Sequence, residues 1–260
     1  MIQKLSKSLL KQLSLLKQKK FRDELDLYFV EGDKIINEML FSNNTIKLII
    51  ATDVWIEKNR NICEKYDVFE TSSEEFQKIS LLKTPNNVIA IAHKEKHEIQ
   101  FGQLKNKLSL ILDHIQDPGN FGTIIRLADW FGIDTIICSE DTVELYNPKV
   151  IQSTMGAFLR VKVIHTQLKP FLELARQTKE FPIFGAVLNG TNIYHSQLSS
   201  HGIVILGNES KGISSEILSF VNHTISIPNF SNNVSKTESL NVAVATAIIC
   251  SEFRRKSKKE

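Results

Sequence analysis

The chain has 260 residues, of which 42% are hydrophobic and 23% charged, and its formal net charge is +3. This composition is ordinary for a globular protein and excludes a disordered chain, and the length allows two modest domains with real cores. Such a small net charge does not indicate a class of binding partner, but basic residues dominate both ends of the chain. Basic ends suit a polyanion, while solvated helix faces remain the alternative interpretation.

Cysteines and histidines give no sign of a disulfide framework or a metal site. Cys63, Cys138 and Cys250 are odd in number, far apart and set in apolar patterns, which predicts buried thiols in a reducing compartment. No histidine stands in a metal-binding spacing, so we expect no metal. No apolar run reaches transmembrane length. We therefore expect a soluble, cytoplasmic protein with no membrane partner.

The first ninety residues predict a small α/β/α domain. Leu5, Leu9, Leu13 and Leu16 recur at helical spacing with lysines between them, which indicates an amphipathic basic helix. Apolar runs then predict strands at 27–30, 46–50, 88–92 and, shorter, from residue 68. Helices are expected from Asp33, over residues 55–65, and from a cap at residue 72 or 73 to residue 79. These elements place the first domain at residues 1–93.

A polar, charged stretch follows and a second α/β domain begins after it. Residues 94–107, with Gly102 in the middle, are predicted to be a linker. Strands are expected at 108–112, 135–138, 161–164, 183–187, 203–206 and 224–227. Helices are expected at 121–131, 148–155, 168–177 and 242–249. Alternation of this kind predicts a mostly parallel, doubly wound sheet over residues 108–260.

Two common nucleotide-binding motifs are absent from this second domain. Dinucleotide binding needs Gly-x-Gly-x-x-Gly in the first strand-to-helix turn, and Gly119 and Gly122 have the wrong spacing. A P-loop needs lysine and then serine or threonine after its second glycine, and Ile213 follows Gly212 instead. Neither a nicotinamide cofactor nor a nucleoside triphosphate is supported.

Three polar segments remain. Each lies beyond the carboxyl end of a predicted strand. They are residues 120–126, 207–212 and 239–242. Taken singly they have plain structural explanations, because an arginine on a helix is usually a surface ion pair and a Gly-x-x-x-x-Gly segment is usually a turn. Taken together they predict one site, because open α/β sheets bind ligands beyond the carboxyl ends of their strands.

These segments resemble the three signature motifs of the SpoU (TrmH) family of RNA ribose methyltransferases, in the SPOUT superfamily. The resemblance covers about residues 105–255, and the first ninety residues resemble the family's appended substrate-binding domain of L30e type. It implies transfer of a methyl group from S-adenosylmethionine to a ribose 2'-hydroxyl, a homodimer, and a C-terminal trefoil knot. The loop from Pro228 to Ser239 is longer than the family pattern.

The resemblance also implies roles for particular residues. The implied catalytic and RNA-facing residues are Asn120, Arg126, Glu209, Ser239 and Asn241. The implied cofactor-binding residues are Val187, Leu206, Gly207, Ile227, Pro228 and Leu240. In addition, the basic N-terminal segment predicts RNA contacts at Lys4, Lys7, Lys11 and Arg22.

Three questions stay open from the sequence. Arg126 could act as the general base, or it could bind a phosphate and stabilise alkoxide charge; we favour the second role, because a guanidinium keeps its proton at neutral pH. The target is expected to be 23S ribosomal RNA, with transfer RNA as the alternative. A non-catalytic RNA-binding protein of the same fold is the remaining interpretation.

Overall fold

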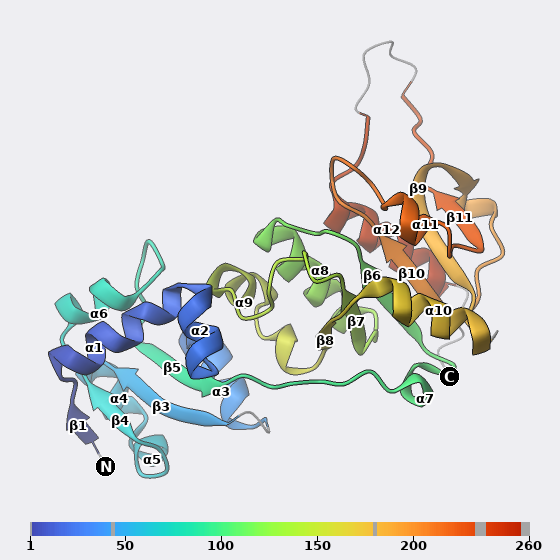
Figure 1. Ribbon diagram of the computed structural model, residues 1–260. Helices are drawn as coiled ribbons and strands as arrows, with labels where there is room; N and C mark the ends of the chain where they lie inside the picture. The colour runs from blue at the N-terminus through green and yellow to red at the C-terminus, as the bar shows by residue number, and fades with distance from the viewer. Residues whose placement is uncertain (1, 43–44, 179–180, 232–237, 256–260) are drawn as a thin grey trace. The chain divides into compact units, whose positions relative to one another are not determined.

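The computed structural model describes residues 2–42, 45–178, 181–231 and 238–255 (Figure 1). The chain divides into two compact units, which are Met1–Lys96 with Leu145–Leu159, and His97–Glu144 with Arg160–Glu260. We call them the N-terminal and C-terminal units. The first division, at residue 96, lies close to the predicted boundary at residue 93, but the return of residues 145–159 to the N-terminal unit was not predicted.

The N-terminal unit contains a five-stranded sheet with strand order β1-β4-β3-β5-β2. Strands β1, β4 and β3 are parallel to one another, and β5 runs antiparallel to both of its neighbours. The strands are β1 (Ile2–Lys4), β2 (Leu27–Glu31), β3 (Ile46–Ala51), β4 (Val68–Glu70) and β5 (Val88–His93). The helices are α1 (Lys7–Ser14), η1 (Leu15–Lys17), α2 (Lys19–Leu25), α3 (Asp33–Leu40), α4 (Asp53–Lys58), α5 (Arg60–Cys63) and α6 (Ser73–Ile79).

The predicted amphipathic helix is present at the start of this unit as α1 and η1. Ser6 caps α1 by accepting a hydrogen bond from the amide of Leu9 at 3.2 Å. Leu13 and Leu16 are buried in a core cluster with Phe29 of β2. The helix predicted over residues 55–65 is instead two short helices, and the side-chain amide of Asn59 at the break donates to the carbonyl of Trp55 at 2.8 Å.

Residues 145–159 contain helix α9 (Pro148–Thr154) and then η2 (Ala157–Leu159). Helix α9 packs on β2, and two aromatic side chains of the segment lie against Tyr28 of that strand. The fully buried ring of Tyr28 lies 4.4 Å from the Tyr146 ring and 6.2 Å from the Phe158 ring, measured between centroids. The Tyr146 hydroxyl donates to the carbonyl of Glu95 at 3.0 Å and accepts from its amide at 2.7 Å. Burial raises the pKa of Tyr146 to about 12, so the phenol stays a donor at neutral pH.

The C-terminal unit contains a six-stranded sheet with strand order β11-β9-β10-β6-β7-β8, and every pairing in it is parallel. The strands are β6 (Leu108–Leu112), β7 (Thr135–Cys138), β8 (Lys162–His165), β9 (Ile183–Asn192), β10 (Gly202–Leu206) and β11 (His223–Ser226). The helices are α7 (Phe101–Leu104), α8 (Pro118–Trp130), α10 (Leu168–Thr178), η3 (Ile193–His195), α11 (Ser215–Leu218) and α12 (Val242–Arg255). This confirms the predicted α/β class, and the strand order reverses between β6 and β10.

Helices of the C-terminal unit cover its sheet and fix one another. Leu172 of α10 and Ile217 of α11 belong to one buried cluster with Ile111 and Ile203 of the central strands. Helix α12 packs on α8, and Arg254 donates to two carbonyls at the end of α8, those of Phe131 at 2.7 Å and Gly132 at 3.0 Å. Residues 232–237 of the predicted knot loop lie outside the described residues, so the trefoil knot stays a prediction.

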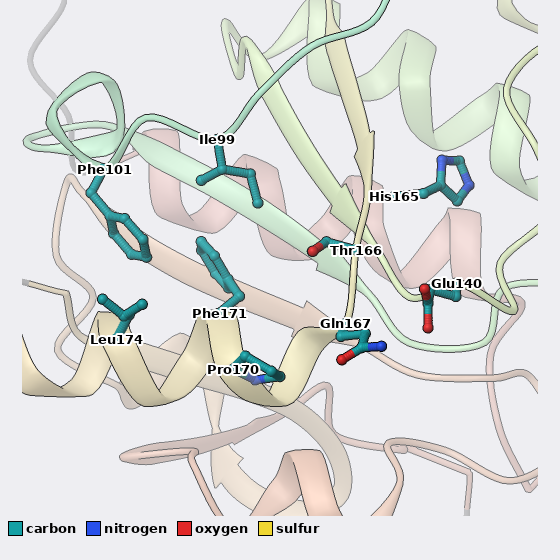
Figure 2. Close-up of a pocket in the computed structure, with 9 residues that line it drawn as sticks. All are labelled: Ile99, Phe101, Glu140, His165, Thr166, Gln167, Pro170, Phe171 and Leu174. Atoms are coloured by element: carbon teal, nitrogen blue, oxygen red, sulfur yellow. The ribbon is translucent and has the colours of Figure 1, made fainter.

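Part of the predicted linker belongs to the core of the C-terminal unit. Residues 101–104 form the short helix α7, and Leu104 is buried. The Phe101 ring stacks on the Phe171 ring of α10 with centroids 5.1 Å apart (Figure 2). This packing explains why the chain is ordered here despite its polar composition.

The three cysteines are free and buried, as predicted. Burial raises the pKa of the Cys250 thiol to about 12 and also raises that of Cys138, so both thiols are protonated and poor nucleophiles at neutral pH. Among the described residues, no helix has the length and hydropathy needed to cross a bilayer. Nor do these residues include three or more His, Cys, Asp or Glu side chains grouped to hold a metal ion.

Candidate functional site

The site is built at the carboxyl edge of the C-terminal sheet, where the strand order reverses. Strands β6 and β10 are neighbours, with Leu112 opposite Leu206 at their ends. The chain leaves β6 toward α8 and leaves β10 into the loop 207–212. The position agrees with the place where ligands bind in doubly wound sheets.

The start of α8 fixes the first motif. Asp117 is the N-cap and accepts from the amide of Asn120 at 2.7 Å, while Pro118 occupies the first turn. Asn120 is thereby held in the first helical turn with its side chain free to reach other loops. Asp117 was not among the predicted site residues, although an Asp-Pro pair before a helix is a recognisable start signal.

The loop 207–212 is closed by its own hydrogen bonds. Asn208 and Gly212 exchange two backbone bonds of 3.0 and 2.9 Å, and the Asn208 side-chain oxygen accepts from the amides of Ser210 and Lys211. A Cβ atom on Gly207 would lie 2.2 Å from the backbone of Gly212, and Gly212 itself has a φ of +70°. The two glycines are therefore required by a tight turn, and the turn presents Glu209.

A chain of side-chain hydrogen bonds joins the three motifs. Asn120 donates from Nδ2 to Oε1 of Glu209 at 2.8 Å and accepts at Oδ1 from Nδ2 of Asn241 at 2.9 Å. An ionised carboxylate can only accept, so its bond fixes the orientation of the Asn120 amide. Residues separated by 89 and 121 positions in the sequence thus meet at one point.

Asn241 also caps α12. Its side-chain oxygen accepts from the amides of Ala243 at 3.0 Å and Val244 at 3.3 Å. The same residue therefore fixes the start of the last helix and reaches the first motif. Ser239 and Leu240, which precede it, are exposed, and the Leu240 residue is 48% exposed.

Arg126 lies further along α8 and is exposed. Within the described part of the chain it has no hydrogen bond or ion pair, unlike Arg160, which binds Asp129 through two nitrogens. A charged guanidinium without a partner, on the helix that carries Asn120, is available to bind an anion.

Five of the six predicted cofactor residues lie in or directly after three adjacent strands, β10, β9 and β11, and the sixth, Leu240, precedes α12. Leu206 is the last residue of β10 and Gly207 follows it, while Ile227 and Pro228 directly follow β11. Val187 lies in β9, where the register with β11 jumps from Gly185 to Thr191, so the chain bulges over residues 186–190. The strand order brings these residues to one edge of the sheet; their contacts with a cofactor stay predictions.

The predicted RNA contacts differ in their exposure. Lys4, Lys7 and Lys11 are exposed on β1 and α1. Arg22 is not: it is 2% exposed, and its Nη1 donates to the carbonyl of Leu16 at 2.7 Å. The prediction for Arg22 is therefore wrong, because the chain turns at Gln18 and α2 directs this side chain into the N-terminal unit.

One hollow in the C-terminal unit is separate from the three motifs. It has a volume of about 420 Å³ and lies between the segment 99–101, the ends of β7 and β8, and α10. Figure 2 shows Ile99, Phe101 and Phe171 on one side of it and Glu140, His165 and Gln167 on the other. None of the predicted site residues lines it.

Comparison with known proteins identifies the family. A model of the SpoU rRNA Methylase family matches residues 107–251, and a model of the MRM3-like substrate binding domain matches residues 7–90. The chain belongs to the SpoU rRNA methylase family. This confirms the family predicted from the three motifs and the appended substrate-binding domain.

Relatives of this SpoU methylase match it along nearly its whole length. The Bacillus subtilis 23S rRNA (guanosine(2553)-2'-O)-methyltransferase RlmP is 26% identical over 237 residues, which is 91% of this chain and 92% of the relative. A TrmH-family structure from Porphyromonas gingivalis has 34% identity and a TM-score of 0.86, covering 97% of this chain and 99% of the other. The AdoMet-bound rRNA methyltransferase of Sinorhizobium meliloti shares the fold, with a TM-score of 0.87 at 24% identity over 99% of each chain.

Proposed function

We propose that this SpoU-family protein transfers a methyl group from S-adenosylmethionine to a ribose 2'-hydroxyl in 23S ribosomal RNA. The observation that carries the proposal is the hydrogen-bonded chain Glu209–Asn120–Asn241, in which all three family motifs meet. The B. subtilis relative is named as a 23S rRNA 2'-O-methyltransferase, which supports the choice of target.

The residues at this edge of the sheet have the chemical character that S-adenosylmethionine requires of a binding site. Leu240 leaves half of an apolar side chain exposed beside polar loops, and Ile227 and Val187 are only partly buried. Apolar side chains of this kind can enclose an adenine ring, and the tight turn at Gly207 leaves backbone groups to read its polar edge. When bound, S-adenosylmethionine supplies a methyl group activated by a sulfonium.

The protein's own residues must present the ribose and manage its charge. The amide of Asn120, oriented by Glu209, and the side chains of Ser239 and Asn241 position the ribose beside the donor. Arg126 binds the adjoining phosphate and stabilises negative charge as it develops on the 2'-oxygen. The proton of the hydroxyl passes to that phosphate or to water.

The N-terminal unit is the RNA-holding part of this proposal. Its match to a substrate-binding domain and the exposed amines of Lys4, Lys7 and Lys11 support electrostatic contact with phosphates. A cytoplasmic location is part of the proposal, and the bacterial relative from B. subtilis supports it.

A homodimer is also part of the proposal. Trp130 on α8 is 83% exposed and Val244 on α12 is 50% exposed, and these two helices pack side by side. The two helices start together at Asn120 and Asn241, so Trp130 and Val244 lie toward opposite ends of the pair. Exposed apolar side chains along such a pair of helices are typical of a surface that another protein covers. A second copy of this chain would bury them.

Mapping 2'-O-methylation in total RNA with and without this protein tests the function. We expect one ribose in 23S RNA to lose its methyl group when the protein is removed, and purified protein with S-adenosylmethionine to restore it. Loss of a transfer RNA methylation instead would replace the target. If no 2'-O-methyl group depends on the protein, the proposed function is wrong.

A further inference from the structure

Two consecutive residues after β6, Asp113 and His114, contact both ends of the loop that carries Glu209. The amide of Asp113 donates to the carbonyl of Leu206 at 2.9 Å, just before the loop begins. The carbonyl of His114 accepts from Nδ2 of Asn208 at 2.9 Å. Oδ2 of Asp113 accepts from the amide of Ser214 at 2.8 Å, just after the loop ends.

These contacts bear on the site because Asn208 organises the loop. Its side-chain oxygen and its backbone together hold Ser210, Lys211 and Gly212, as described above. Glu209 lies between these bonds, so a shift of Asn208 would move the carboxylate that orients Asn120.

The backbone and ring of His114 are both unusual. Its φ is +59°, in the left-handed region that residues other than glycine adopt uncommonly, and its carbonyl faces Asn208. Its amide donates to Oγ of Ser139 at 2.9 Å, which ties it to the loop after β7.

The imidazole lies between two carboxylates. Nε2 is 3.6 Å from Oδ1 of Asp113, which comes from its own segment, and Nδ1 is 3.7 Å from Oδ2 of Asp141, which comes from the loop after β7. The Asp113 side chain is 2% exposed and that of His114 is 43% exposed. A protonated ring would be attracted to both carboxylates at once, whereas a neutral ring would not.

We infer that Asp113 and His114 are positioning residues that hold the Glu209 loop, and that positive charge on the His114 imidazole tightens their hold. Charge on the ring draws Asp113 and Asp141 toward it and so fixes the two segments that bind Asn208 and Ser214. The kinetic part of this inference rests on the proposed function; the structural part does not.

His114→Asn is the decisive variant, because asparagine accepts a positive φ and keeps the backbone carbonyl but cannot carry charge. Asp141→Asn removes the exposed carboxylate, and Glu140→Gln is its matched control on the same loop. Asp113→Asn keeps an acceptor for Ser214 while removing the buried charge. The surface variants keep the test valid even if the buried variant does not fold.

The first measurement is the ratio of variant to wild-type kcat between about pH 6 and pH 8, the range in which histidine changes charge. For His114→Asn we expect a loss of roughly tenfold at the acid end, because a small displacement of catalytic groups is costly. The ratio should approach one at the alkaline end, with KM for S-adenosylmethionine unchanged. Asp141→Asn should follow the same trend, and Glu140→Gln should match wild type throughout.

The second measurement is hydrogen exchange of the amides of Lys211 and Gly212, which requires no methyl transfer. We expect His114→Asn to speed their exchange roughly tenfold at about pH 6 and to have little effect at about pH 8. If exchange of these amides is unchanged in His114→Asn, the inference that His114 holds the loop is wrong. If the ratio of kcat values does not vary with pH, the inference that charge on His114 affects turnover is wrong. If wild type methylates no RNA, the proposed function fails and the exchange data alone decide the inference.

Discussion

At the level of single residues, the position of Arg126 favours one of its two possible roles. It stands exposed, without a partner among the described residues, on the helix whose first turn holds Asn120. An arginine that keeps its proton binds phosphate well and accepts protons poorly. Charge stabilisation therefore fits this position better than general-base catalysis.

We expect Arg126→Ala to lower kcat by about 100-fold to 1,000-fold, the usual cost of removing a donor to developing oxyanion charge. Binding of S-adenosylmethionine, measured by calorimetry, should survive, because the predicted cofactor residues lie on other loops. Lost cofactor binding would refute this role.

Arg126→Lys separates the two mechanisms. If the residue stabilises charge, its activity should be partly retained and should fall above about pH 10, where a free lysine loses its proton. If the residue is the base, activity should instead rise with pH as the neutral amine forms. A pH profile of single-turnover rates distinguishes these outcomes.

The family resemblance implied roles for Asn120, Glu209 and Asn241 but not how their side chains touch. The hydrogen bonds between them show that the three segments meet, while their catalytic roles stay predictions. Asn208 and Asp117 were missed because their bonds are local loop and cap contacts. Arg22 was misassigned because charge alone does not reveal that a chain turns inward.

At the level of elements, α1 has an apolar side in the core and a basic side in solvent. Leu13 packs into the core, while Lys7 and Lys11 face solvent, with Lys4 on the preceding strand. Exposed amines along one element can release counterions from RNA when they bind phosphates.

Replacing Lys4, Lys7 and Lys11 together by glutamine should weaken RNA binding and make it less sensitive to salt. Each lost phosphate contact on single-stranded RNA removes roughly 0.7 from the slope of log K against log salt concentration, so the slope should become shallower by about 2. Filter binding at several salt concentrations measures this. The matched control is the exposed triple Lys47, Lys58 and Lys65 to glutamine, which changes charge equally in the same unit. Equal slopes for the two triples would exclude α1 as the RNA contact.

Element boundaries were predictable where apolar runs are sharply bounded. The helix capped by Ser72 and the strand at 135–138 match the structure. Strand β1 was not predicted, because three residues carry no usable periodicity before they pair with β4. Strand β9 is longer than expected, because its bulge opposite Ile225 is a tertiary feature.

At the level of the whole molecule, the exposed apolar side chains of α8 and α12 should govern assembly. Trp130→Glu should convert a dimer to a monomer of 29.6 kDa, measured by light scattering after gel filtration. Phe41→Glu is the control, because Phe41 is 93% exposed in the N-terminal unit and should not affect association. A monomeric wild-type protein would contradict the proposal of a homodimer.

The return of residues 145–159 to the N-terminal unit is the feature that sequence reasoning could not reach. Their composition is that of any α/β crossover, and their place in the other unit follows from tertiary contacts, such as those with Tyr28 and Glu95. The chain consequently passes between the two units three times, at residues 96, 144 and 159.

A fragment that ends at residue 96 would therefore lack part of the packing of the N-terminal unit. Tyr28 would lose the aromatic rings of Tyr146 and Phe158, and exposing one such side chain costs about 2 kcal/mol. We expect a fragment of residues 1–96 to unfold at a lower urea concentration than the same fragment joined to residues 145–159 by a flexible linker. Equal urea midpoints would show that the fragment is self-sufficient.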